Sequence, residues 1–166
     1  MPTKQINKQL KTAGVGIALT TALLATPGAV WAQTSDCASF AATGWPGMSL
    51  KTEAVAGDSV RPPGVTAGPL LVAHCKIAGK MAERTGQDGK PYHIGFELRL
   101  PTAWNGRFLY QGGGGNDGVV RPAVGPQAAP GYALNRGFAV VTTDAGHQGP
   151  TADFGFDPIA RTDNAY

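Results

Sequence analysis

Apolar and polar residues alternate most clearly along residues 92–100. The apolar side of this segment carries Ile94, Phe96, Leu98 and Leu100. The other side carries His93, Glu97 and Arg99. This period of two predicts a strand with one buried face and one exposed face, closed by Pro101. A second apolar segment, residues 70–77, predicts another strand. The Gln-Asp-Gly turn signal at 87–89 favours an antiparallel arrangement of the two.

The later part of the chain predicts alternating short strands and helices. Residues 108–110 predict a third strand, and the β-rich run 138–142 has the apolar character of an interior parallel strand. Residues 129–135 predict a short helix that ends near Gly137. Asp157 as N-cap and Pro158 as first helical residue begin a last helix, which is unfinished at Tyr166. A domain does not normally end within an element, so we expect the sequence to be cut short.

A glycine-rich loop follows the third strand. Gly112 to Gly115 are consecutive, and Asn-Asp-Gly118 comes next. Glycines adopt positive φ angles and let a ligand approach bare backbone, but ordering them is costly. Such a loop offers amide N–H groups to an anion, either a phosphate or the oxyanion of acyl transfer. A purely structural turn is the third interpretation.

Nucleotide binding does not fit this loop. Gly113, Gly115 and Gly118 match the spacing of the dinucleotide fingerprint, which requires a helix to open at the last glycine. Prolines interrupt the segment that follows, at 122, 126 and 130, and Asp144 lies beyond the usual distance of about 20 residues. No Gly-Lys-Ser/Thr of a P-loop follows either. An oxyanion loop after the third strand fits the order of an α/β-hydrolase better, in which the nucleophile follows later.

Residues 1–32 have the pattern of a cleaved signal peptide. A basic start is followed by an apolar run over 14–25 and a Val-Trp-Ala site ending at Ala32. The apolar run is too short to span a bilayer comfortably. Three of the 14 basic residues lie in this segment, which leaves 11 Lys and Arg against 11 Asp and Glu. We therefore expect a secreted or periplasmic domain over 33–166, with no nucleic-acid partner and no membrane partner after cleavage.

Two cysteines, Cys37 and Cys75, are expected to form a disulfide. Both lie in the predicted mature chain, and an oxidising compartment favours their pairing. Closing a loop of about 38 residues stabilises a fold by about 4 kcal/mol in the chain-entropy model. A metal site is disfavoured, because the nearest ligand, His74, points to the opposite face of a strand.

Several motifs together resemble the tannase and feruloyl esterase family, which includes bacterial hydrolases of mono(2-hydroxyethyl) terephthalate. They cover nearly all of residues 37–166 in order: His-Cys at 74–75, Arg-Thr-Gly-x-Asp-Gly at 84–89, Phe-Glu-Leu-Arg-Leu-Pro at 96–101, Trp-Asn-Gly-Arg-Phe at 104–108, the glycine loop, Ala-Val-Val-Thr-Thr-Asp-x-Gly-His at 139–147, and Phe-Asp-Pro at 156–158.

The resemblance implies a secreted serine esterase that cleaves esters of aromatic acids such as gallate or ferulate. Its fold would be an α/β-hydrolase core, with antiparallel amino-terminal strands leading into a mostly parallel sheet. The resemblance also implies a Cys-Ser-x-Gly-Gly nucleophile elbow, a downstream acid and histidine, and calcium held in a lid. None of these parts is in this sequence, so the core is expected to be incomplete. Gly115 matches the family's backbone oxyanion donor.

Other residues suit catalysis poorly. Ser35, Ser39, Ser49 and Ser59 all precede the predicted sheet, and no Gly-x-Ser-x-Gly occurs. Asp144 and His147 lie three apart on one loop without a serine. Asp144 is expected to accept backbone N–H bonds at the end of its strand. Trp45 and Trp104 are expected to pack at the core or its rim.

The sequence leaves two hypotheses for the function, one enzymatic and one non-enzymatic. The first is the amino-terminal part of a serine carboxylic ester hydrolase whose 166-residue portion alone is inactive. The alternative is a secreted, disulfide-closed, non-enzymatic fragment or gene remnant.

Overall fold

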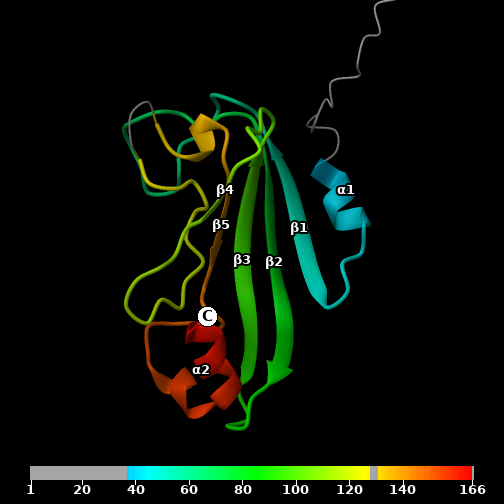
Figure 1. Ribbon diagram of the computed structural model, residues 1–166, viewed down its shortest axis with the longest axis vertical. Helices are drawn as coiled ribbons and strands as arrows, with labels where there is room; N and C mark the ends of the chain where they lie inside the picture. Colours follow the sequence, from blue (N-terminus) through cyan, green and yellow to red (C-terminus); the bar gives the residue numbers. More distant parts are fainter. Residues whose placement is uncertain (1–36, 128–130, 166) are drawn as a thin grey trace, which may run out of the picture.

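The computed structural model describes residues 37–127 and 131–165, so the predicted signal peptide lies outside the described residues. A five-stranded mixed sheet has the order β1-β2-β3-β5-β4 (Figure 1). Its strands are β1 (Met48–Val55), β2 (His74–Thr85), β3 (Pro91–Pro101), β4 (Phe108–Tyr110) and β5 (Ala139–Thr143). The helical elements are α1 (Cys37–Ala42), the 3₁₀ turns η2 (Leu134–Arg136) and η3 (Asp153–Phe156), and α2 (Pro158–Ala165).

The antiparallel strands come first, as expected. β1 pairs with β2, β2 with β3 and β3 with β5, all antiparallel. Only β4 and β5 run parallel among the described strands. The mixed sheet is consistent with an α/β fold, whereas the expected mostly parallel sheet is limited here to that one pair.

The β2–β3 hairpin confirms the predicted turn and corrects one strand boundary. Gly89, with φ of 77°, donates its N–H to Gly86 O over 3.0 Å in the turn. β2 begins at His74 and runs to Thr85, so the strand predicted at 70–77 was placed too early. Leu71 instead pairs with an earlier loop, since its N–H donates to Val60 O at 2.9 Å. The second half of β2 lacks an apolar signal because its side chains are mostly exposed.

β5 is the interior strand that its composition predicted. It lies between β3 and β4, and Val140 and Thr142 are 0% and 1% exposed. Its observed bounds differ from the predicted 138–142 by one residue at each end. It is parallel to β4 and antiparallel to β3.

The helix predicted at 129–135 was wrong in extent. Residues 128–130 lie outside the described residues, and the described part contains only the single 3₁₀ turn η2. Gly137 ends this turn as expected, with φ of 84° and its N–H on Leu134 O at 3.0 Å. The neighbouring Pro130 and Gly131 disfavour a longer helix.

Two apolar clusters lie on opposite faces of the sheet. Ile77, Leu98 and Val141 are aligned across β2, β3 and β5, so they share one face, and Val140 points to the other. The first face holds Cys37, Cys75 and Ile77 with the side chains packed on them. The second cluster comprises Leu71, Ala123, Val124, Tyr132, Ala133, Leu134 and Val140.

The predicted disulfide is confirmed. Cys37 of α1 is bonded to Cys75 of β2, with 5.4 Å between their Cα atoms. The bond fixes α1 beside the β1 side of the sheet, where Figure 1 shows it. Both cysteines therefore serve the fold rather than a metal or a nucleophile.

A buried polar network corrects the expectation that Arg99 lies on an exposed face. Arg99 is 4% exposed, its Nε donates to Glu97 Oε1 at 2.7 Å, and its Nη1 lies 3.3 Å from His74 Nε2. Glu97 also accepts the N–H of Ala123, which belongs to the segment covering this face. Burial lowers the pKa of His74, partly opposed by the hydrogen bond of its Nδ1 to Val72 O. A neutral His74 thus donates to Val72 and accepts from Arg99.

Asp157 begins α2 as predicted. Its Oδ1 accepts the N–H of Ala160 at 2.8 Å, and its Oδ2 accepts that of Gln87 at 2.9 Å. These backbone hydrogen bonds, with Arg84 at 2.9 Å, hold the pKa of Asp157 below its usual value. The cap therefore also ties α2 to the end of the β2–β3 hairpin, where the two lie together in Figure 1.

Candidate functional site

The loops that follow β4 and β5 meet at one edge of the sheet. Because these strands are parallel, their carboxyl ends lie together, which is where open α/β sheets bind ligands. Gly118 N–H donates to Asp144 O at 3.2 Å, and Gly149 N–H donates to Gly118 O at 3.0 Å. The glycine loop and the 144–149 loop thus form one candidate site.

Gly115 occupies the tip of a tight turn. Asp117 N–H donates to Gly114 O at 3.2 Å, and φ is 65° at Gly115 but not positive at Asn116. This is the pattern of a type II′ turn, whose first central position favours glycine. Gly115 is exposed, and its N–H donates to no described residue. The turn therefore presents an uncommitted backbone donor.

The other glycines of the loop have different reasons to be glycine. Of the four consecutive glycines, only Gly115 has a positive φ. A side chain on Gly113 would collide with the Asp117 carboxylate, whereas one on Gly114 would meet nothing within 4 Å. Gly118 has φ of 81° and lies against Gly149 O, and a Cβ there would also stand 2.8 Å from His147 Cε1. Part of the glycine pattern is therefore structural, and Gly115 is the one of the four consecutive glycines that combines a positive φ with open surroundings.

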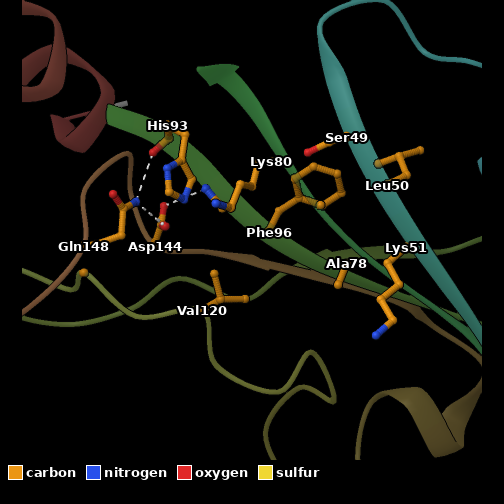
Figure 2. A pocket seen from close by; sticks show the side chains of 13 residues that line it. Ser49, Leu50, Lys51, Ala78, Lys80, His93, Phe96, Val120, Asp144 and Gln148 are labelled. Carbon is orange, nitrogen blue, oxygen red and sulfur yellow. Dashed lines mark hydrogen bonds between the residues drawn. The ribbon is translucent and has the colours of Figure 1, made fainter. Parts of the chain in front are cut away.

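Asp144 accepts backbone N–H groups at the strand end, as predicted. It is 3% exposed, and its Oδ1 accepts from Gly95 and Gly146, each at 3.0 Å. Gln148 Nε2 donates to Asp144 Oδ2 at 2.8 Å and to the His93 carbonyl at 3.2 Å. Figure 2 shows Gln148 between these two groups. The carboxylate is thus occupied in shaping the loop.

His147 is buried beside the glycine loop. Its side chain is 2% exposed, its Nε2 is hydrogen-bonded to Asn116 O, and its ring stacks on Phe154 with centroids 3.9 Å apart. No hydrogen bond joins His147 to Asp144 among the described residues. The two side chains are thus bonded to other groups instead of to each other.

A cavity of about 570 Å³ borders Asp144 on the sheet (Figure 2). His93, predicted as an exposed strand residue, is half-buried and lines it, because the 144–149 loop covers its end of β3. Lys51 and Lys80 bring positive charge to the same wall. The cavity can therefore receive a polar or anionic group close to the carboxyl end of β5.

An apolar groove of about 470 Å³ crosses the opposite face. Trp45 lines it and is 47% exposed, with its Nε1 on Phe40 O at 3.2 Å. Trp104 is 40% exposed and donates to Arg107 O at 2.8 Å. Both tryptophans pack at the rim of the structure rather than in its core.

Neither a nucleophile nor a metal centre is visible in the described part of the chain. Ser59 Oγ donates to Ala56 O at 2.6 Å, and Ser49 lies on β1 in the wall of the cavity. Within residues 37–127 and 131–165, no three His, Cys, Asp or Glu side chains are grouped to hold a metal ion. The calcium that the family resemblance implies is expected in a lid outside this sequence, and we derive no step through it. The helices of this part are all too short or too polar to cross a membrane.

Comparison with known proteins decides the family. The sequence model described as "Tannase and feruloyl esterase" matches residues 75–166, more than half of the chain. The chain belongs to this family. The match takes in the glycine loop, the 144–149 loop and α2, and therefore the whole candidate site.

The curated relatives of the chain include a hydrolase and a probable esterase. A mono(2-hydroxyethyl) terephthalate hydrolase from Piscinibacter sakaiensis is 40% identical over 135 residues, covering 74% of this chain and 22% of the relative. A probable feruloyl esterase B-2 from Aspergillus flavus is 43% identical over 56 residues, covering 34% of this chain and 10% of the relative. The chain thus spans about a fifth or less of the length of these relatives.

Solved structures of esterases share the fold. Feruloyl esterase B from Aspergillus oryzae is 27% identical with a TM-score of 0.54, and an esterase from the same organism is 24% identical with a TM-score of 0.57. Each alignment covers 80% of this chain and 26% of the other. The five-stranded sheet of this tannase-family chain is therefore an arrangement that occurs in esterases.

Sequence reasoning singled out Gly115, Asp144 and the disulfide, and it missed the contact of His147 with the glycine loop. His147 and Asn116 are 31 residues apart, so no local pattern joins them. A prediction that β4 and β5 pair in parallel would have placed the loops that follow them side by side, and this was the signal that could have indicated the contact.

Proposed function

We propose that this chain is the amino-terminal part of a carboxylic ester hydrolase that acts on esters of aromatic acids. Family membership supports ester hydrolysis in general. The aromatic substrate class is supported by two relatives, whose names specify terephthalate and ferulate. The chemistry proposed is attack by a serine, formation of an acyl-enzyme and its release to water.

In this proposal Gly115 N–H stabilises the tetrahedral oxyanion. The observation that carries it is the type II′ turn with an exposed, uncommitted Gly115 amide at the carboxyl end of β4. One such donor contributes about 3 kcal/mol to transition-state stabilisation. The serine, the acid and the histidine are proposed to lie in sequence beyond Tyr166.

Export belongs to the same proposal. The signal-like pattern of residues 1–32 and the disulfide between Cys37 and Cys75 support a secreted or periplasmic protein. Mass spectrometry of material exported by a bacterial host tests this, with a mature amino terminus at Gln33 as the expected result. Retention of Met1 in exported material would contradict the cleavage site.

Two experiments test the hydrolase proposal. Sequencing the coding DNA past Tyr166 is expected to reveal a Cys-Ser-x-Gly-Gly elbow within some tens of codons, whereas a stop codon would favour the non-enzymatic alternative. The purified 166-residue chain is expected to show no hydrolysis of methyl ferulate, because an esterase that lacks its catalytic triad retains only a weak rate enhancement. Saturable hydrolysis by the chain alone would refute the assignment of the nucleophile to the missing part.

A chimera provides a second test with the chain itself. This chain would replace the aligned segment of the Piscinibacter sakaiensis hydrolase, which supplies the remaining four fifths or so of the enzyme. Esterase activity in a folded chimera is expected. A folded chimera without activity would contradict the proposed role of this segment.

A further inference from the structure

His147 has the burial and hydrogen bonding of a residue that holds another group in place. Its side chain is 2% exposed, and its Nε2 contacts the carbonyl oxygen of Asn116. A carbonyl only accepts hydrogen bonds, so the proton is on Nε2 and His147 is the donor. This contact crosses from the loop after β5 to the loop after β4.

The ring of His147 stacks on the ring of Phe154. The interplanar angle between the two rings is 14°. Phe154 belongs to η3, and its carbonyl accepts the N–H of Asp157 at 3.0 Å. Asp157 is in turn bonded to Gln87 at the end of the β2–β3 hairpin. The imidazole is thus stacked on an element that is tied by hydrogen bonds to the turn of the β2–β3 hairpin.

Few contacts hold the Gly115 turn. A Cβ at Gly115 would meet nothing within 4 Å, so no neighbouring side chain packs against the tip. Asn116 is the second central residue of the turn, and its carbonyl accepts hydrogen bonds from His147 Nε2 and, at the longer distance of 3.5 Å, from Asn164 Nδ2 of α2. Two residues further on, Gly118 is fixed through Asp144 and Gly149. The carboxyl-terminal side of the turn is therefore anchored at Asn116 and at Gly118. Of the two hydrogen bonds to Asn116 O, the one nearest to Gly115, that from His147 is the shorter and comes from a buried side chain.

We propose that His147 is a positioning residue, whose hydrogen bond to Asn116 O fixes the Gly115 turn in the conformation that presents its N–H to the oxyanion. The inference rests on the proposed function, because it needs Gly115 to be a donor in catalysis. It assigns to His147 no proton transfer, since its Nε2–H is committed to backbone. His147 acts only through the geometry of the turn.

Matched variants of His147 in the complete enzyme test the proposal. His147→Phe keeps a ring to stack on Phe154 but has no donor, whereas His147→Gln places an amide N–H close to the position of Nε2. We expect His147→Phe to lower kcat by about tenfold or more with KM nearly unchanged, because the lost interaction acts in the transition state. His147→Gln is expected to recover most of that kcat.

A second pair keeps the test informative if the phenylalanine disturbs folding. His147→Gln and His147→Met both lack the ring and have side chains of similar length, but only glutamine donates. A kcat for His147→Met equal to that of His147→Gln, in folded proteins, would overturn the inference. So would a His147→Phe enzyme with unchanged kcat.

A double-mutant cycle separates this inference from the proposed function. If His147 acts through Gly115, His147→Phe should add little to the loss caused by Gly115→Val. Additive losses would show that His147 acts elsewhere and would overturn the inference alone. A normal kcat for Gly115→Val would instead refute the oxyanion assignment. Inhibition by phenylboronic acid, which forms a tetrahedral adduct with a serine, should weaken in parallel with kcat.

Discussion

Replacement of Gly115 by valine gives the most direct test of the glycine loop. With φ of 65°, Gly115 lies in the left-handed region, where a β-branched residue is strained. Such strain costs about 1–3 kcal/mol, enough for an exposed turn to relax toward negative φ. Relaxation rotates the peptide that carries the Gly115 N–H and so removes one oxyanion donor.

The expected loss in catalysis follows from the value of one donor. Removal of an oxyanion-hole donor costs about 2.7–4 kcal/mol, or about 10²–10³-fold in kcat. The assay is the steady-state hydrolysis of methyl ferulate by the complete enzyme, with thermal unfolding measured on the same samples. Stability should fall less than activity, because the added side chain has open space around it.

Gly114→Val is the matched control. Gly114 also faces open space, and its φ lies outside the left-handed region, so valine adds the same bulk without the backbone strain. We expect its kcat to stay near that of the parent enzyme. If Gly115→Val stays folded and keeps a near-normal kcat, the loop is a structural turn and the oxyanion assignment is wrong.

The remaining predictions concern Gly118, the disulfide and His74. Gly118→Ala should destabilise the protein because φ is 81° and a Cβ would press on Gly149 O, and an unchanged melting temperature would contradict this close approach. Alkylation before reduction should label neither Cys37 nor Cys75. Replacing both by alanine should lower the free energy of unfolding by about 4 kcal/mol, measured with urea. His74 has a lowered pKa in the fold, so the unfolded state binds more protons below the ordinary value of 6.5 and stability should fall as the pH drops through that range. A urea midpoint that does not fall on acidification, or one that falls equally in His74→Gln, would exclude His74 as the cause.

Local patterns were sufficient for elements whose signals are local. The alternation over 92–100 identified β3, and Asp157-Pro158 identified the start of α2, because one face of a strand and one N-cap are encoded within a few residues. β2 was placed too early because its outer half carries polar side chains into solvent. The helix predicted at 129–135 was too long, because the proline and glycine in this segment disfavour a helix.

Contacts between segments that are distant along the chain could not be predicted from local sequence patterns. Alternation placed Arg99 on the polar face, but nothing in the pattern showed that the segment around Ala123 covers that face and buries the guanidinium. In the same way, nothing in the sequence showed that Gly149 O lies against Gly118 and leaves no room for a side chain there. Gly115 and Asp144 could be singled out because a run of glycines and a polar residue at a strand end are local patterns, whereas the contact of Asp144 with Gly95 on β3 could not be predicted.

The strand order has a consequence for how the protein is made. β5 lies between β3 and β4, so β4 has no place in the sheet until a strand about 30 residues further along the chain has arrived. The aromatic β4 segment is therefore left without its partner strand until those residues have also reached the sheet. When β5 joins the sheet, it becomes the neighbour of β4, and the loop that follows β5 brings His147 to the Gly115 turn. Within the described part of the chain, the step that brings β4 into the sheet is therefore also the step that shapes the candidate site.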